Sequence, residues 1–302
     1  MSILRGTRKL LLAAGLAGCG AAAAVLLSGL NAESDGFKAR AANVIQSHFN
    51  DHLGPNASIM SSTATTKWDA NWDRRDPFCL VKPMSGSFRV TEKDENKYNE
   101  KLEKAKSMAT RHLILVRHGQ YNLSGETDIL RTLTPLGRDQ AYHVGLRLKD
   151  LALPYTRIIQ STMTRATETA NIISQHLPNI PVDSCHFIRE GSPIKPDPPV
   201  HHWRPEPKQF FEDGARIEAA FRKYFHRADP TQKKDSYEIM VCHANVIRYF
   251  VCRALQFPPE AWLRFSLHNC SLTWIAIRPS GRVVVYTVGD IGHVPPNKMT
   301  TT

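Results

Sequence analysis

The chain has 302 residues, of which 42% are hydrophobic and 22% are charged, an ordinary globular composition from which a sizeable core can form. Its formal net charge of +11 suits an anionic partner. However, no Arg/Lys block with interleaved aromatic residues and no Cys/His finger spacing occurs, so nucleic acid is not expected. The six cysteines form no CxxC pair and no metal-type cluster, and we expect buried, reduced thiols.

The N-terminal residues predict a membrane anchor. A basic stretch, residues 1–9, precedes an uncharged run from Leu10 to Leu30, long enough as a helix to cross a hydrocarbon core of about 30 Å. A cleaved secretory signal is the alternative, because Leu16-Ala17-Gly18-Cys19 resembles a lipoprotein cleavage site. The apolar run continues past that point, so we favour a single transmembrane helix over residues 10–30.

Residues 31–66 are polar and weakly patterned and predict a flexible linker. Residues 67–110 then combine a tryptophan-rich stretch with a charged lead-in, in which 91–108 predicts a solvated helix. Taken alone, the tryptophan-rich stretch has two readings. Its indoles could pack on their own domain, or it could be a self-association motif, because tryptophan anchors dominate many interfaces. Its key residues are Trp68, Asp69, Asn71, Trp72 and Asp73.

Residues 111–294 alternate between strand and helix patterns, and a short tail covers 295–302. Repeated βα units predict an α/β fold, a layered sheet of mostly parallel strands with helices on both faces. We expect strands over 113–116, 157–160, 182–188 and 238–242, and a hairpin over 271–277 and 282–288. The expected helices begin at Thr134-Pro135, after Ser161, at an Asp213 cap and after His243.

Four fragments at strand ends carry candidate chemistry. Arg117-His118-Gly119 follows the apolar run Leu113–Val116, where an arginine fork and an imidazole suit phosphate. Arg165 falls in the opening turn of a helix, Glu190 lies at a strand-to-loop junction, and His243 repeats the architecture of the first fragment. Each fragment alone has an ordinary reading as a strand end or a surface residue.

Together, these fragments and their order resemble the histidine phosphatase superfamily, the clan that includes cofactor-dependent phosphoglycerate mutases. Within it, the chain is similar to the mitochondrial Ser/Thr protein phosphatases of the phosphoglycerate mutase family. That closer similarity rests on the basic N-terminus with its anchor, the Trp68–Asp73 stretch, Pro198-Pro199-Val200 with Trp203, and the segment from His243 to Arg248.

The resemblance implies a metal-independent, cofactor-free enzyme that removes phosphate from phosphoserine, phosphothreonine and, as a further candidate, phosphohistidine in proteins. It implies catalytic roles for His118, as phosphohistidine nucleophile, Glu190 and His243, and phosphate-binding roles for Arg117, Arg165 and His243. We do not carry over the mutases' asparagine to Asn122, because its spacing from His118 differs.

The resemblance also implies a single-pass protein of a mitochondrial membrane, assembled into a multimer through Trp68–Asp73. Residues Asn31–Gly36 resemble a binding motif for a Kelch-repeat adaptor, with an Asp and a Gly at positions where the motif has Gly and an acid. Two alternative functions stay open: a small-molecule phosphomonoester mutase or phosphatase, and a mitochondrial scaffold. We expect the proline-rich loop Ser192–Pro207 to form a stiff wall over the site. This loop bears on whether the substrate is a protein or a small molecule.

Overall fold

The computed structural model describes residues 67–84, 91–200 and 203–301. All of them belong to the second of two units into which the chain divides, residues 66–302. The predicted anchor Leu10–Leu30 and the adaptor-like segment Asn31–Gly36 therefore lie outside the described residues. Within the described ranges, no helix combines the length and apolar character that crossing a bilayer requires.

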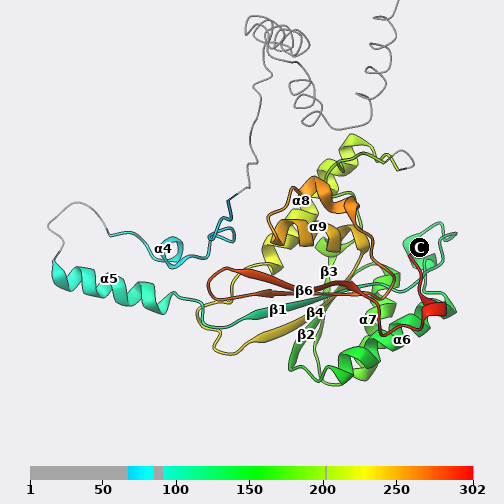
Figure 1. The fold of residues 1–302 in the computed structure, drawn as a ribbon, viewed down its shortest axis with the longest axis horizontal. Helices are drawn as coiled ribbons and strands as arrows, with labels where there is room; N and C mark the ends of the chain where they lie inside the picture. The colour runs from blue at the N-terminus through cyan, green and yellow to red at the C-terminus, as the bar shows by residue number, and fades with distance from the viewer. Residues whose placement is uncertain (1–66, 85–90, 201–202, 302) are drawn as a thin grey trace, which may run out of the picture. The chain divides into compact units, whose positions relative to one another are not determined.

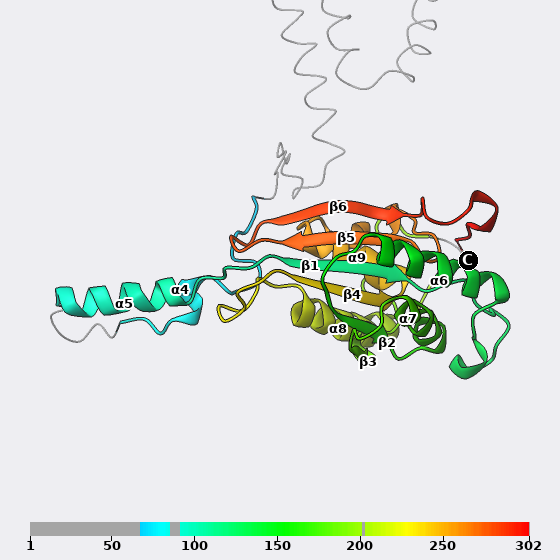
Figure 2. The same ribbon diagram turned by 90° about the horizontal axis from the view of Figure 1, so that it is seen from below.

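A six-stranded sheet forms the centre of the described unit, with the strand order β3-β2-β4-β1-β5-β6 (Figure 2). The pairs β2·β3, β2·β4 and β1·β4 are parallel, whereas β5 runs antiparallel to both β1 and β6. The predicted sheet of mostly parallel strands is therefore confirmed. The strands are β1 (Arg111–Arg117), β2 (Tyr155–Ser161), β3 (Val182–Cys185), β4 (Ser236–Cys242), β5 (Leu272–Ile277) and β6 (Val283–Asp290).

Helices cover both faces of the sheet, as predicted (Figure 1). The apolar residues of β1 alternate between two cores: Leu113 and Leu115 pack with residues of α8 and α9, and Ile114 and Val116 with residues of α6 and α7. This explains why β1 reads as an unbroken apolar run. The helices are α4 (Pro77–Leu80), α5 (Glu92–Lys104), α6 (Pro135–Asp150), α7 (Thr164–His176), α8 (Pro207–Tyr224) and α9 (Ala244–Ala254).

Local capping chemistry sets several helix starts. Thr134 caps α6, with its Oγ1 accepting from the Gly137 N–H at 3.0 Å, and Pro135 occupies the first helical position, as predicted. The predicted solvated helix is α5, which begins with a capping box between Thr91 and Asp94. Short 3₁₀ segments link other elements: η1 (Asp128–Leu130), η2 (His186–Ile188), η3 (Pro259–Arg264) and η4 (Pro296–Lys298).

Three sequence expectations need correction. Asp213 does not cap α8, which starts at Pro207 after Glu206; Asp213 lies inside the helix, where its carboxylate accepts from the Ser192 N–H. The strand predicted over 182–188 ends at Cys185 and continues as η2. Cys79 is an exposed free thiol, whereas the other described cysteines are buried and free, as expected: Cys185, Cys242, Cys252 and Cys270.

Candidate active site

Three neighbouring parallel strands bring distant residues together. Arg117 is level with Cys242 across β1 and β4, and Gln160 of β2 is level with Val241. The residues that follow, His118, His243 and Ser161, therefore meet at the carboxyl edge of the sheet, where reactive groups of open α/β sheets collect. The His118 and His243 ring centroids are 5.1 Å apart.

His118 is held as a neutral imidazole with one free nitrogen. Its Nδ1 lies 2.8 Å from the Gly119 carbonyl oxygen, which can only accept, so Nδ1 carries the proton and Nε2 keeps its lone pair. The ring is 2% exposed. Burial, followed by the nearby charges of Arg165 and Arg117, holds the pKa of His118 well below its ordinary value. The unprotonated Nε2 is what a nucleophile requires.

Arg165 comes from the first turn of α7 and faces this nitrogen. Its Nε donates to His118 Nε2 at 3.2 Å, and its guanidinium lies over the Tyr121 ring at 4.5 Å. The Asp128 carboxylate lies 3.6 Å from Arg165 Nη1. At 3% exposed, Arg165 is not the surface residue that a lone arginine usually is. The fold places its charge at the unprotonated nitrogen of His118.

His243 lies fully buried against the end of β2. Its Nε2 lies 2.8 Å from the Ser161 hydroxyl. Burial comes first among the effects that hold the pKa of His243 well below its usual value, followed by the interaction with His118 and the charges of Arg165 and Arg117. These effects favour the neutral form of His243.

Glu190 is the carboxyl group of the cluster. Its Oε1 accepts from the Gly191 N–H at 3.1 Å. Burial raises the pKa of Glu190, and the Gly191 hydrogen bond and the charges of Arg165 and Arg117 offset only part of that rise. Raising this pKa favours the protonated form, which a general acid needs.

Several buried nitrogen atoms of the cluster have no hydrogen-bond partner within the described ranges. They are Arg117 Nε, Arg165 Nη1 and His243 Nδ1. Buried polar atoms are almost always paired, because leaving one unpaired costs about 1–3 kcal/mol. The two arginine nitrogens are donors, and with the His243 nitrogen they provide unpaired polar groups suited to the oxygens of an anion such as a phosphoryl group.

Comparison with known proteins points to the same chemistry. The sequence profile of the histidine phosphatase superfamily (branch 1) matches residues 113–288. The chain belongs to the histidine phosphatase superfamily.

Relatives within this superfamily include serine/threonine-protein phosphatase PGAM5, mitochondrial, of Homo sapiens, 57% identical over 77% of this chain and 80% of the relative. The Caenorhabditis elegans protein of the same name is 54% identical over 78% and 81%, respectively. A crystal structure of phosphoglycerate mutase from Plasmodium falciparum, at 36% identity, covers 62% of this chain and 96% of that one, with a TM-score of 0.45. The resemblance to mitochondrial Ser/Thr protein phosphatases predicted from sequence is confirmed.

Sequence reasoning named Arg117, His118, Arg165, Glu190 and His243 as candidates but missed the groups that hold them. Ser161, the partner of His243, carried a usable signal as a polar residue at the end of an apolar strand. Tyr121 and Asp128 carried none, because they lie between β1 and α6 and only the fold brings them to Arg165. Asn122 is exposed and bonds within its own loop, donating to the Leu130 carbonyl oxygen.

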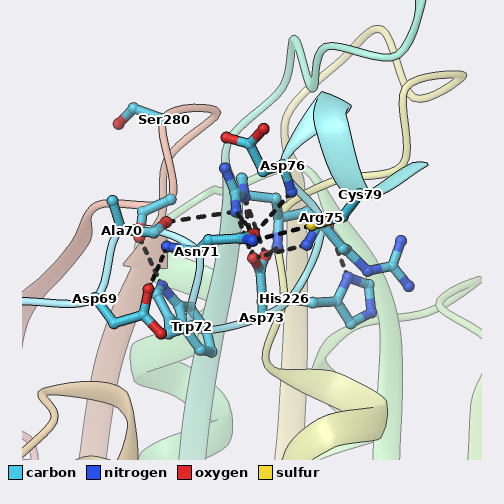
Figure 3. Close-up of polar contacts among 12 residues, drawn as sticks. Asp69, Ala70, Asn71, Trp72, Asp73, Arg75, Asp76, Cys79, His226 and Ser280 are labelled. Carbon is cyan, nitrogen blue, oxygen red and sulfur yellow. Dashed lines mark hydrogen bonds and ion pairs between the residues drawn. The ribbon is translucent and has the colours of Figure 1, made fainter. Parts of the chain in front are cut away.

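The tryptophan-rich segment docks on its own domain, as one of its two readings predicted (Figure 3). Trp72 Nε1 donates to the Gly281 carbonyl oxygen at 2.8 Å, and its ring lies 5.9 Å from that of Phe221. Asp73 forms a buried ion pair with Arg227, with Nη2 to Oδ1 at 2.6 Å. Trp68, by contrast, is 39% exposed. Docking of Trp72 and Asp73 leaves one indole available to a partner.

Proposed function

We propose that this chain is a protein phosphatase acting on phosphoserine and phosphothreonine, with phosphohistidine as a further candidate substrate, through a phosphohistidine at His118. The observation that carries the proposal is that Arg165 and His243 lie against the unprotonated Nε2 side of His118, with buried nitrogens of Arg117, Arg165 and His243 left unpaired for phosphoryl oxygens. Relatives more than half identical are named mitochondrial serine/threonine-protein phosphatases, which supports the same substrate class.

In the first step, the Nε2 lone pair of His118 attacks phosphorus in line with the ester bond. The P–N bond forms, the P–O bond to the seryl or threonyl oxygen breaks, and Glu190 gives its proton to that oxygen. Arg117 and Arg165 hold the non-bridging oxygens, each charged hydrogen bond contributing about 1.5–3 kcal/mol. His243, whose pKa burial lowers, is a candidate donor to the same oxygens once the charge of the phosphoryl dianion offsets that effect.

In the second step, the Glu190 carboxylate takes a proton from water, whose oxygen attacks the phosphorus. The P–N bond breaks, its electron pair returns to Nε2, and inorganic phosphate leaves. One carboxyl group serves as acid and then as base, which suits a group whose pKa is raised toward the working range.

The test is phosphate release from a phosphoserine or phosphothreonine peptide. We expect His118→Ala to abolish turnover without unfolding the domain, and His186→Ala, the same change at an exposed histidine, to leave it intact. Labelled phosphate trapped by acid-free quenching should be found on His118. Full activity of His118→Ala would disprove the nucleophile.

Substrate class is decided by a second comparison. At matched concentrations, the wild-type chain should turn over the phosphopeptide faster than 3-phosphoglycerate. A strong preference for phosphoglycerate would instead identify a small-molecule enzyme. Rescue of the cellular role by His118→Ala would favour a scaffold.

The proposal includes placement and assembly. Residues 10–30 would anchor the chain as a single pass in a mitochondrial membrane, and Trp68–Asp73 would assemble it into an active multimer, the exposed Trp68 being available to a second copy. Replacing Trp68 and Trp72 together by Ala should lower both the mass measured by light scattering and the specific activity. An unchanged mass would restrict this segment to its contacts within one chain.

A further inference from the structure

The segment that follows β6 returns to the active site. Residues 298–301, which begin with the last residue of η4, lie beside α6, as the red end of the ribbon shows in Figures 1 and 2. This segment contacts two amide side chains that are both 0% exposed, Gln140 of α6 and Asn269 before β5. Neither amide takes part in the proposed phosphoryl transfer. The burial of two polar side chains against a short, partly exposed segment therefore needs another explanation.

Thr300 links the two amides. Gln140 Nε2 donates to Thr300 Oγ1 at 2.9 Å and to the Lys298 carbonyl oxygen at 2.7 Å. The Thr300 hydroxyl donates in turn to Asn269 Oδ1 at 2.8 Å, and the Asn269 N–H donates to the Thr300 carbonyl oxygen at 2.9 Å. One hydroxyl therefore satisfies a buried donor and a buried acceptor at once.

The same two amides hold the backbone on either side of the nucleophile. Asn269 Nδ2 donates to the His118 carbonyl oxygen at 3.2 Å, and Gln140 Oε1 accepts from the Gln120 N–H at 2.9 Å. Thr300 thus completes a relay that reaches both flanks of His118 and Gly119.

The segment also contacts Arg117 directly. Arg117 Nη1 donates to the carbonyl oxygens of Leu267 and Thr301, the latter at 2.8 Å. Both acceptors occupy one nitrogen, while Nε is buried and unpaired in the described part of the chain. The Nε–Nη2 edge, which binds an anion through two parallel hydrogen bonds, is left available.

We propose that residues 298–301 are a positioning clamp of the active site: Thr300 fixes the His118 turn through Gln140 and Asn269, and the Thr301 carbonyl oxygen turns the Nε–Nη2 edge of Arg117 toward the phosphoryl group. This clamp rests on the proposed function, because its effect is on phosphoryl transfer at His118. None of its residues touches the substrate.

A matched pair of variants in the full chain tests the clamp. Thr300→Val keeps the shape and removes the hydroxyl, whereas Thr231→Val makes the same change at an exposed threonine in the loop between α8 and β4, where the hydroxyl donates to Asp229. We expect Thr300→Val to lower kcat on a phosphopeptide about tenfold, with KM changed less than threefold, because a small misplacement of reacting groups acts on the chemical step. Thr231→Val should stay within twofold of wild type, and Thr300→Ser, which restores the hydroxyl, should recover activity.

Orthovanadate affinity, measured by calorimetry, gives a readout independent of turnover and should weaken in Thr300→Val but not in Thr231→Val. If the wild-type chain binds orthovanadate but releases no phosphate from any phosphopeptide, the proposed function fails while the vanadate comparison still tests the clamp. Equal kcat and equal vanadate affinity in Thr300→Val and wild type would overturn the clamp.

A chain stopped after Lys298 gives a second test, because it removes the Thr300 and Thr301 contacts together. We expect kcat to fall about a hundredfold, with the thermal melting curve confirming that the domain stays folded. A rise in kcat would overturn positioning and show instead that the Thr301 oxygen competes with substrate for Arg117.

Discussion

Buried arginines lie at both ends of the sheet, but their hydrogen-bond and ion-pair partners differ between the two ends. At the amino end of β1, Arg111 pairs with the Glu238 carboxylate, and Arg227 with Asp73, so each cation has a carboxylate partner. At the carboxyl end, Arg117 is held by carbonyl oxygens, and Arg165 has a carboxylate only at 3.6 Å. Neutral or distant partners leave positive charge uncompensated, which is what a dianionic ligand needs.

The comparison teaches how one residue type can serve stability at one place and chemistry at another. A buried arginine with a matched carboxylate is electrostatically complete and has little to offer a ligand. A buried arginine that is oriented by carbonyl dipoles keeps an uncompensated positive charge and part of its guanidinium group available for hydrogen bonds. The free-energy cost of burying it is therefore offset when phosphate binds. Variants at the two ends should therefore separate activity from stability.

The largest expected effect is on activity at the carboxyl end. Arg165→Gln should lower kcat/KM for a phosphopeptide about 10³-fold, because one preorganised donor to the transferring group is lost. Its melting temperature should not fall, since the change removes a buried cation whose carboxylate partner, Asp128, lies only at 3.6 Å. Arg222→Gln, at an exposed arginine of α8, is the control for activity. A large loss of stability with retained activity would reverse the assignment of the two ends.

The next effect is on stability at the amino end. Asp73→Ala should lower the free energy of unfolding by about 3 kcal/mol, because it leaves Arg227 buried without its carboxylate. Urea unfolding followed by tryptophan fluorescence measures this change. Asp69→Ala removes an exposed carboxylate from the same segment and should cost less than about 0.5 kcal/mol. Equal effects of the two variants would show that the Asp73–Arg227 pair does not hold the segment.

Lowering the pH should lower the free energy of unfolding through the two histidines of the active site. His118 and His243 have pKa values held below the ordinary 6.5, so the unfolded chain binds more protons than the folded chain as pH falls through that value. Stability is present above about pH 6.5 and is lost below it, by about 2 kcal/mol between pH 7 and 5.5. Urea titrations at several pH values measure the slope.

A control locates that acid sensitivity. Replacing His118 and His243 by Gln should reduce the pH dependence without abolishing it, because burial and Arg111 lower the pKa of His226, at the amino end, to about 4, so this histidine also destabilises the fold from about pH 6.5 downward. An unchanged slope in the double variant would mean that other groups carry the effect.

The smallest effect concerns one hydrogen bond. Trp72→Phe keeps an aromatic ring against Phe221 and removes the Nε1–H that donates to the Gly281 carbonyl oxygen. We expect a loss of about 1 kcal/mol in the free energy of unfolding and no change in kcat of the assembled enzyme. Trp68→Phe, at the more exposed indole, should leave stability within about 0.5 kcal/mol of wild type. A larger loss for Trp68 would show that the exposed indole carries the docking.

Much of the fold was predictable because its signals are local. The apolar run of β1, the Thr134-Pro135 start of α6 and the βα alternation each depend on neighbouring residues alone, and each was confirmed. Where two local signals competed, the prediction failed: Pro207 starts α8, and Asp213, a good cap by type, serves instead to bind the Ser192 N–H. Side-chain type alone does not say which contact a carboxylate will make.

The candidate site likewise has features that the sequence predicts and features that only the fold decides. The sequence by itself determined which residues meet, since Arg117, His118 and His243 end adjacent parallel strands and Arg165 opens a helix. Only the tertiary structure decided how they are held and charged. The acceptor for Arg117 is the backbone oxygen of Thr301, 184 residues away, and a carbonyl group is common to every residue and leaves no mark in a sequence. The lowered pKa of His118 likewise arises from burial, which depends on all the elements packed around it.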